Sequence, residues 1–343
     1  MVIFTKLKIT TLPELPEVQT TVNGINKKLK GLRIVDIWTD YPARHYDNPQ
    51  WQNSEKISSR QIKNKHFFNY FKKNIVGKKI TGAERRAKNV LIHLSANKTP
   101  SKTAKGRCET ILIHMKMTGH LLFGKYEKVN TKTKNLKPKT TKWVAQEPGP
   151  LRDDSFNQFI HLVFSLSNGK HLVLSDMRKF AKVLLIENFG LNTSSELSHL
   201  GPEPLTSNFS LKVLKERLNK KPNWPIKSAL MDQTLISGIG NIYSDEILWA
   251  SNIHPLRKVE DLKTSQFIKI LVNTKLILKK GIDFKGDSMS DYRNIDGRRG
   301  RFQNEHQAYR RTGKPCTKKR CPGTIKRTGV RGRNAHFCST HQK

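Results

Sequence analysis

The chain has 343 residues, which is long enough for two or three domains that each bury a hydrophobic core. Lys and Arg outnumber Asp and Glu by 64 to 27, and the formal net charge of +37 favours a polyanionic partner, nucleic acid first, because basic side chains that neutralise phosphates drive binding. No apolar run could span a bilayer, the first residues lack the apolar core of a secretory signal, and four cysteines argue against a disulfide framework, so we expect a soluble intracellular protein without a membrane partner.

The first half of the chain is predicted to contain one helix followed by many short strands. Apolar residues recur at helical spacing from Val18 to Leu29, which predicts a helix over residues 16–30 that Gly31 ends. Strands are predicted at residues 33–38, 77–94 (two strands), 110–117, 120–126, 159–166, 170–175 and 181–187. Antiparallel strands in this number indicate a β-sandwich with flanking helices. The Lys- and Thr-rich stretches 97–107 and 128–142 are expected to be surface loops.

The hydrophobic period changes after the proline-rich stretch 200–205. Helices are predicted at residues 211–218, 226–233, 241–250 and 261–279, and a basic segment with three cysteines begins near Tyr309. We therefore expect an α+β multidomain protein. Residues 1–12 would be an extension, 13–200 the β-sandwich domain, 206–305 a helical domain and 309–343 a small cysteine-bearing domain.

Four potential metal ligands lie near the end of the chain in the spacing Cys316-x4-Cys321-x16-Cys338-x2-His341. Two ligand pairs separated by about the length of a hairpin suit a closed tetrahedral site. Reduced cysteines in a basic tail are the alternative, but they leave the paired spacing unexplained. We expect one structural Zn²⁺ bound by three cysteines and one histidine, in a C-terminal zinc-finger β-hairpin.

Near its front the chain carries the motif Pro13-Glu14-Leu15-Pro16-Glu17-Val18. Taken alone, this is a helix start with acidic residues near the positive end of the helix dipole. Together with the motifs described below, it resembles the bacterial-type formamidopyrimidine-DNA glycosylase family. The resemblance implies that Pro13 is a nucleophile that forms a Schiff base through a terminal amine, and that Glu14 is its proton donor.

Residues 1–12 stand in front of this nucleophile. A proline nitrogen within a peptide bond is an amide and cannot attack, so we expect the mature chain to begin at Pro13. Some leucine codons serve as alternative initiators, in which case Leu12 would be read as a methionine and removed. Processing of a longer chain is the rival explanation. A chain that kept residues 1–12 would bind damaged DNA without catalysis.

Residues 226–233 and 238–243 resemble the helix-two-turn-helix of the same family. The resemblance implies a DNA-binding clamp to which Lys227 and Asn241 contribute. Gly238 and Gly240 would let the backbone approach a phosphate, and the free N–H groups at the start of the second helix would bind it. A nucleotide site is the usual alternative meaning of a lone Gly-x-Gly.

Two basic residues match catalytic positions of the family. Lys88, in Arg85-Arg86-Ala87-Lys88-Asn89, matches the β-turn lysine that reaches the lesion and donates a proton in β-elimination. Arg333, in residues 332–337, matches the arginine of the zinc-finger hairpin that contacts phosphates flanking the lesion and donates a proton in δ-elimination. An exposed turn lysine and an exposed tail cation are the plain alternatives.

Three further residues match those that fill the gap left by an extruded nucleotide. Met117 and Phe180 are apolar wedges that could replace a base in the stack, and Arg178 could hydrogen-bond to the orphaned partner base. Residues 288–302 match the segment that bears the mobile lesion-recognition loop of the family.

The resemblance implies a bifunctional DNA glycosylase and AP lyase of base excision repair. Its expected substrate is damaged double-stranded DNA, from which it would remove 8-oxoguanine and formamidopyrimidines with β,δ-elimination. We expect a monomer in the cytoplasm, associated with the nucleoid. The nearest alternative enzyme is an endonuclease VIII-like glycosylase for oxidised pyrimidines.

Overall fold

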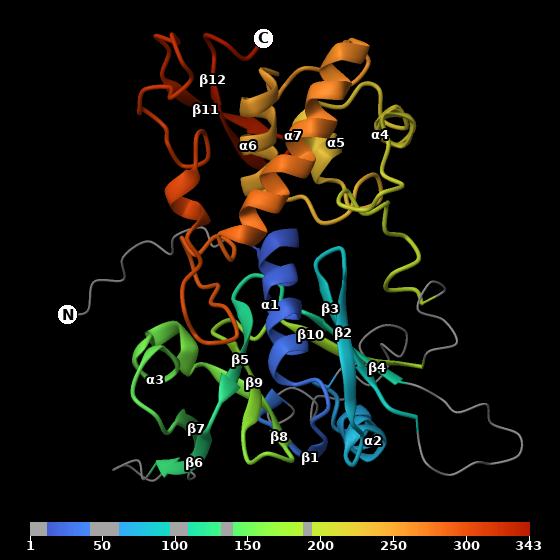
Figure 1. Cartoon of the computed structure of the whole chain (residues 1–343), viewed down its shortest axis with the longest axis vertical. Coiled ribbons are helices and arrows are strands. Elements are labelled where there is room, and N and C mark those ends of the chain that lie inside the picture. Colours follow the sequence, from blue (N-terminus) through green and yellow to red (C-terminus); the bar gives the residue numbers. More distant parts are fainter. Residues whose placement is uncertain (1–11, 42–61, 97–108, 132–139, 188–193) are drawn as a thin grey trace, which may run out of the picture.

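The computed structural model describes residues 12–41, 62–96, 109–131, 140–187 and 194–343. Two antiparallel four-stranded sheets form the lower part of the molecule, with strand orders β1-β8-β9-β5 and β10-β4-β3-β2 (Figure 1). The bounds of these strands are β1 Ile34–Thr39, β2 Ile80–Arg86, β3 Asn89–Leu94, β4 Glu109–His114, β5 Gly119–Gly124, β8 Ile160–Leu166, β9 His171–Asp176 and β10 Lys182–Glu187. This is the predicted β-sandwich.

Apolar side chains from both sheets meet in one core, because alternate residues of each strand point to the same face. Ile92 and Ile111 contribute from one sheet, Leu121 and Leu174 from the other, and all four are buried. The turn at residues 167–169 joins β8 to β9 as predicted, with Gly169 at a φ of +73°. The register pairs Phe164 with Leu172 in this hairpin.

Helix α1 (Leu15–Lys28) connects the sandwich to the rest of the molecule. Pro16 lies in its first turn, where a missing N–H costs nothing. Val18, Val22 and Ile25 point into the sandwich core, whereas Leu15 packs into the core of the helical domain. The helix contacts β2 on one side and α7 on the other, and Figure 1 shows it standing between the two parts.

Helix α2 and one hairpin of the sandwich domain were not among the elements predicted from the sequence. Helix α2 (Lys65–Ile75) is capped by the Asn64 side chain and buries Phe71. Strands β6 (Tyr126–Thr131) and β7 (Thr140–Ala145) form a hairpin within the stretch that was expected to be a loop, so that expectation was wrong for these strands. The other expected loop, 97–107, lies outside the described residues.

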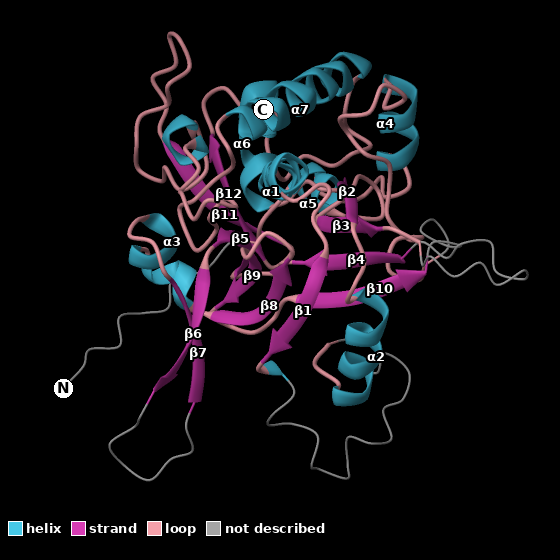
Figure 2. Ribbon diagram, turned by 60° about the horizontal axis from the view of Figure 1, so that its bottom comes forward, coloured by secondary structure: helices cyan, strands magenta, loops and turns pink. Residues whose placement is uncertain are grey.

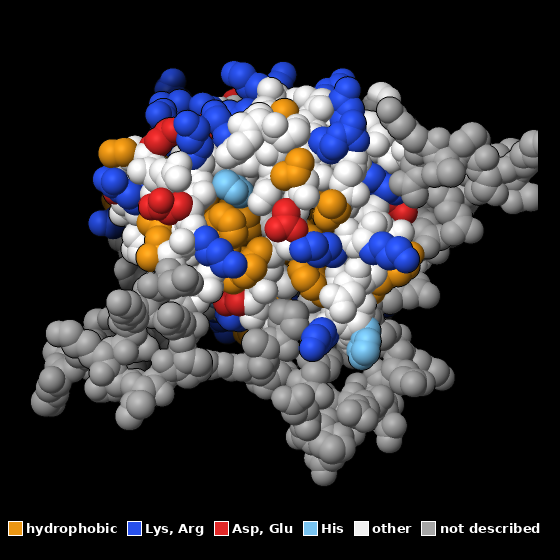
Figure 3. Space-filling model, turned by 90° about the horizontal axis from the view of Figure 1, so that it is seen from below, with side chains coloured by type: hydrophobic (Ala, Val, Ile, Leu, Met, Phe, Trp, Pro, Cys, Tyr) orange, Lys and Arg blue, Asp and Glu red, His pale blue; other side chains and the backbone are white. Residues whose placement is uncertain are grey.

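The β6–β7 hairpin extends away from the body of the sandwich in Figure 2, and the short helix α3 (Pro150–Asp153) follows it. Side chains at its base form a small hydrophobic cluster with Tyr126 and Leu122. Basic side chains gather along the upper edge of the face seen in Figure 3, so the charge of this face is unevenly spread.

The helical domain comprises α4 (Leu211–Leu218), α5 (Ile226–Met231), α6 (Asn241–Ser251) and α7 (Thr264–Asp283), at the predicted places. Residue Asn252 ends α6 in a left-handed conformation. The C-terminal strands β11 (Ile325–Val330) and β12 (Arg333–Cys338) pair as a hairpin whose second strand contacts α6. The α+β multidomain fold is thereby confirmed. In the part of the chain that is described, no helix is long and apolar enough to cross a membrane.

Candidate active site

The Glu14 side chain lies at the N-terminus of α6, although the two are far apart in the sequence. Its carboxylate accepts hydrogen bonds from the backbone N–H groups of Gly240 (2.7 Å), Ile242 (2.8 Å) and Tyr243 (3.3 Å). The residue is 2% exposed. Burial raises the pKa of Glu14, although Lys88 and the three N–H donors oppose this effect. A carboxyl group with a raised pKa can hold a proton for transfer.

Gly238 and Gly240 make this arrangement possible. Gly238 has a φ of +89°, and a Cβ atom there would come within 2.8 Å of the Leu15 side chain. A Cβ atom on Gly240 would lie 2.4 Å from the Glu14 carboxyl carbon. The N–H groups of Gly240 and Ile242, at the start of α6, were expected to be free for a phosphate. That expectation is wrong, because both donate to the Glu14 carboxylate. The glycines serve the approach of α1 to α6.

Glu17 binds the backbone of Glu14 through its carboxylate, a role that was not predicted. Its carboxylate accepts hydrogen bonds from the Glu14 N–H (2.8 Å), the Tyr243 hydroxyl (2.7 Å) and the Asp287 N–H (2.7 Å). Burial and the nearby Glu14 charge raise the pKa of Glu17 to about 7. Two buried carboxyl groups in one turn hold a proton more readily than either alone. The second glutamate of the Pro-Glu-x-Pro-Glu motif was the available signal.

Lys88 lies in the turn between β2 and β3, at the same site. Burial lowers the pKa of Lys88, the charges of Glu14 and Glu17 raise it, and Arg333 lowers it. The structure thus brings Lys88 within electrostatic reach of Glu14, Glu17 and Arg333. Among the described residues, none forms a hydrogen bond or ion pair with the Lys88 ammonium group that would hold it away from a ligand.

A partly buried carboxylate, that of Glu203, holds this turn against the helical domain. Glu203 binds Arg85 at 2.5 Å and Arg86 at 3.0 Å, and it accepts a hydrogen bond from the Ala87 N–H at 2.5 Å. Ala87 has a positive φ of 54°, which only a fixed environment maintains in a residue with a side chain. The motif around Lys88 is therefore shaped by a residue from beyond the sandwich domain.

Met117, Arg178 and Phe180 come together from two loops. The Arg178 guanidinium lies 3.5 Å from the Met117 sulfur and 4.6 Å above the Phe180 ring centre. Phe180 is 46% exposed, so this group presents apolar surface to the solvent. The Thr118 hydroxyl joins the loops, since it donates to the Asp176 carboxylate and accepts from the Arg178 N–H.

Lys227 is not available as a DNA contact in this structure. Its side chain is 0% exposed and its ammonium lies 2.5 Å from the Asp245 carboxylate. The other Asp245 oxygen accepts a hydrogen bond from the His336 N–H of β12. A buried ammonium needs a charged partner, and with Asp245 as that partner Lys227 joins α5 to α6; its contact with DNA stays a prediction. The Asn241 side-chain oxygen is buried and has no hydrogen-bond partner among the described residues.

The four predicted metal ligands lie together. The side-chain donor atoms of Cys316, Cys321, Cys338 and His341 all lie within 4.8 Å of one another. His341 Nδ1 is 3.5 Å from the Cys316 sulfur, while its Nε2 lies 3.2 Å from the Trp249 carbonyl oxygen. A carbonyl accepts a hydrogen, so Nε2 carries the proton and Nδ1 keeps a lone pair for a metal. Within the described residues, no other group of three or more His, Cys, Asp or Glu side chains is placed to hold a metal ion.

The chain is similar to known proteins over most of its length. Residues 12–183 match the formamidopyrimidine-DNA glycosylase N-terminal domain, and residues 200–293 match the formamidopyrimidine-DNA glycosylase H2TH domain. It is 30% identical over 331 residues to the formamidopyrimidine-DNA glycosylase of Herpetosiphon aurantiacus, with 96% of this chain and 100% of the relative covered. The enzyme of the same name from Chloroflexus aggregans is 33% identical over 328 residues, with 95% and 97% covered.

Solved structures show the same likeness. Lactococcus lactis Fpg in complex with DNA that contains an abasic site has a TM-score of 0.73 and 28% identity, with 96% of this chain and 99% of that chain covered. A mutant of Lactococcus lactis Fpg with DNA that contains Fapy-dG has a TM-score of 0.73 and 27% identity, with 96% and 100% covered.

Proposed function

The chain belongs to the formamidopyrimidine-DNA glycosylase family of DNA-repair enzymes, and we propose that it removes oxidised purines and then cleaves the resulting abasic site. The proposed substrates are 8-oxoguanine and formamidopyrimidines in double-stranded DNA. One observation carries the proposal. Glu14, the residue directly after Pro13, has a buried carboxyl group with a raised pKa, and Lys88 lies within electrostatic reach of it. The solved relatives with abasic-site and Fapy-dG DNA support the substrate class.

The damaged base must leave the helix before any chemistry can occur. Met117 and Phe180 would enter the space that it vacates, and Arg178 would hydrogen-bond to the base left without a partner. Their loops already hold these side chains together at one exposed position. Unstacking a base costs a few kcal/mol, which inserted side chains partly offset.

Pro13 is the proposed nucleophile, and this requires a chain that begins at Pro13 with a free amine. A terminal amine titrates near pH ~8 and a lysine near ~10.4, so the terminal amine has the larger neutral fraction at pH 7. The amine attacks C1′ of the nucleotide while Glu14 protonates the sugar ring oxygen. The bond from C1′ to the base breaks, and the base leaves with the proton that the amine releases. The bond from C1′ to the ring oxygen then opens onto the proton from Glu14, which leaves a cationic Schiff base between Pro13 and C1′. The family match begins at residue 12, which fits this start.

Lys88 and Arg333 would serve the elimination steps. The Schiff base withdraws electrons, so a proton is lost from C2′ and the 3′ phosphate departs from C3′. The new C2′=C3′ double bond extends this effect to C4′, whose proton is lost as the 5′ phosphate departs from C5′. Lys88 is proposed as the proton donor of β-elimination, and its lowered pKa favours transfer of its proton. Arg333 would bind the flanking phosphate and assist δ-elimination, and Asn241 is proposed as a second phosphate contact.

The Cys316, Cys321, Cys338 and His341 cluster is proposed to bind one structural Zn²⁺. In a tetrahedral site with a Zn–S distance of about 2.3 Å, two sulfur atoms lie about 3.8 Å apart. The Cys321 and Cys338 sulfurs are 3.6 Å apart, which fits this geometry. Four protein ligands leave no position for a substrate, so the ion would hold β12 and hence Arg333 in place.

Every group named above lies on one chain, so we propose that the enzyme acts as a monomer and, because its substrate is DNA, at the nucleoid.

Two duplexes test the function, one with 8-oxoguanine opposite cytosine and one with thymine glycol. Faster release of 8-oxoguanine is expected, and Glu14→Gln should abolish it. Preference for thymine glycol would make the chain an enzyme for oxidised pyrimidines, and full activity of Glu14→Gln would remove its assigned role.

A further inference from the structure

The segment of residues 287–300 runs from the active site back onto the sandwich domain. We propose that Arg293, Asp154 and Asn157 form a latch between the domains that fixes this segment in the position needed to bind an extruded base. These are positioning residues, which act through the segment. The proposal rests on the proposed glycosylase function and assigns a determinant of its base specificity.

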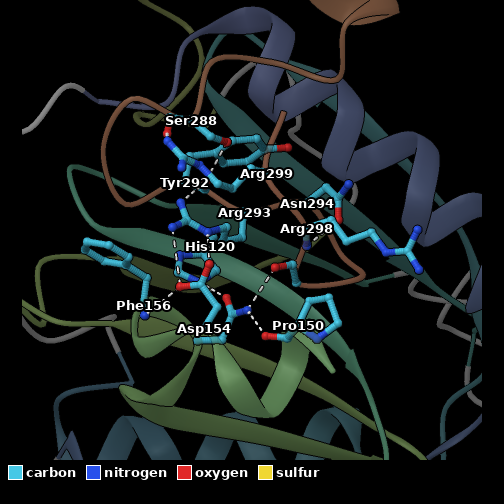
Figure 4. Close-up of polar contacts among 12 residues, drawn as sticks. His120, Pro150, Asp154, Phe156, Ser288, Tyr292, Arg293, Asn294, Arg298 and Arg299 are labelled. Atoms are coloured by element: carbon cyan, nitrogen blue, oxygen red, sulfur yellow. Dashed lines mark hydrogen bonds and ion pairs between the residues drawn. The ribbon is translucent and has the colours of Figure 1, made fainter. Parts of the chain in front are cut away.

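Arg293 makes the first half of the latch. Its Nε donates to an Asp154 carboxylate oxygen at 2.6 Å, and Nη2 lies 3.3 Å from the other oxygen, so the pair is bidentate (Figure 4). The guanidinium lies 4.9 Å above the Phe156 ring centre. The Arg293 side chain is 5% exposed, so water competes little for these bonds. Asp154 and Phe156 both belong to the sandwich domain.

The same guanidinium also fixes the shape of its own segment. Nη1 donates to the carbonyl oxygens of Ser290 and Tyr292, each at 2.9 Å. The Ser288 hydroxyl donates to the Tyr292 carbonyl at 2.7 Å and accepts from the Gly300 N–H at 2.8 Å. One buried cation thus binds the sandwich domain and folds residues 288–293 around itself.

Asn157 makes the second half. Its Nδ2 donates to the Gly297 carbonyl at 3.0 Å and to the Pro150 carbonyl at 2.7 Å. Two carbonyl acceptors set the orientation of this amide, so its oxygen faces His120 Nε2 at 3.0 Å and accepts a hydrogen there. Burial lowers the pKa of His120 to about 4, which keeps the imidazole neutral. Gly297 has a φ of +75°, and a Cβ atom there would lie 2.7 Å from Asn157.

Main-chain pairing continues this attachment. Ile295 is 3% exposed and packs in the sandwich core, and its carbonyl accepts a hydrogen bond from the Phe123 N–H of β5 at 2.8 Å. The segment therefore contacts the sandwich through a side-chain ion pair, an amide bridge and a buried apolar residue. These contacts anchor the segment that matches the lesion-recognition loop of the family at three places on the sandwich domain.

The other end of the segment lies at the proposed active site. The Asp287 N–H donates to the Glu17 carboxylate at 2.7 Å, and the Tyr292 hydroxyl donates to the Glu17 carbonyl at 3.0 Å. Burial raises the pKa of Asp291, whereas Arg293 and then Arg178 lower it, which places Asp291 within electrostatic reach of the wedge residue Arg178. Met289, which lies between Asp287 and Asp291 in the sequence, is 40% exposed. Residues 289–291 thus lie between the catalytic helix and the wedge residues.

Base removal and abasic-site cleavage place different demands on this region. An abasic site has no base to bind, so its cleavage needs the Pro13 amine and its proton donors but not a base-binding segment. Loss of the latch should therefore slow release of 8-oxoguanine while leaving cleavage of an abasic duplex nearly unchanged. A merely structural role would lower both activities together.

The test compares kcat/KM on an 8-oxoguanine:cytosine duplex and on an abasic duplex for Asp154→Asn, Arg293→Gln and Gly297→Ala. Because misplacement by about 1 Å costs on the order of a hundredfold, we expect base removal to fall at least tenfold and abasic cleavage to change less than twofold. Arg152→Gln is the matched control, since it breaks the exposed Arg152–Asp153 pair on the same turn and should change neither activity.

Two results would overturn the latch: equal losses on both duplexes in all three variants, or no loss in any of them. The proposed function fails in a different way, because the unaltered chain would then not release 8-oxoguanine. Gly297→Ala keeps every charge in place, so it separates loss of position from loss of an ion pair.

Discussion

Replacing Gly240 with alanine should disable the enzyme without unfolding it. The backbone at Gly240 has φ −136° and ψ −152°, and this negative φ does not require glycine. The alanine Cβ atom would lie 2.4 Å from the Glu14 carboxyl carbon, where ordinary contact begins at 3.4 Å, so the carboxyl group must retreat by about 1 Å. Displacement of a catalytic group by that amount costs on the order of a hundredfold in rate, or about 2.7 kcal/mol.

Single-turnover release of 8-oxoguanine measures this loss. We expect Gly240→Ala to react about a hundredfold more slowly than the unaltered chain, with DNA affinity changed only a few-fold. Gly82→Ala is the matched control, because a Cβ atom there meets only the Asn26 side-chain oxygen at 3.4 Å. Wild-type rates in Gly240→Ala would refute the conclusion that the α6 N-terminus positions Glu14 for catalysis.

Three further changes test other parts of the structure. Burial raises the pKa of Glu17 from 4.5 to about 7. Because the unfolded chain then loses this proton at a lower pH than the folded chain, the free energy of unfolding falls as pH rises from 4.5 to 7. In thermal melts, Glu17→Gln should lessen that fall. Asp245→Asn leaves Lys227 buried without a charged partner, and urea unfolding should show a loss of about 3–5 kcal/mol. Elemental analysis should find one zinc per chain, retained by His341→Cys and lost by His341→Ala; zinc retained in full by His341→Ala would exclude this ligand.

Much of the fold, and part of the candidate site, could be predicted from residue spacing and local sequence pattern. The cluster that could bind a metal was predictable because its two residue pairs, and the hairpin between them, lie within a short stretch of sequence. Helix α4 was predicted at its observed bounds, since its apolar residues repeat at helical spacing. Glu14 was identified from its motif, although no local pattern predicted which groups would bind its carboxylate.

Residues whose roles depend on distant partners were less predictable. The resemblance assigned Lys227 to the DNA clamp, and no local pattern predicted that Asp245 and the packing of α5 against α6 would bury its side chain. Glu203 and Asp154 each bind arginines more than a hundred positions away in the sequence. The β6–β7 hairpin is Lys- and Thr-rich, and it pairs Lys128 with Trp143 across strands that composition alone suggested were loop.

Borohydride trapping on an 8-oxoguanine:cytosine duplex tests the central claim most directly, because borohydride reduces a Schiff base to a stable adduct between protein and DNA. Chains that begin at Met1 and at Pro13 would be run side by side, with binding to the same duplex measured for both. The proposed chemistry predicts that the Pro13 chain is trapped and the Met1 chain is not. Binding by both chains without any trapped adduct, or equal trapping of both, would contradict Pro13 as the nucleophile.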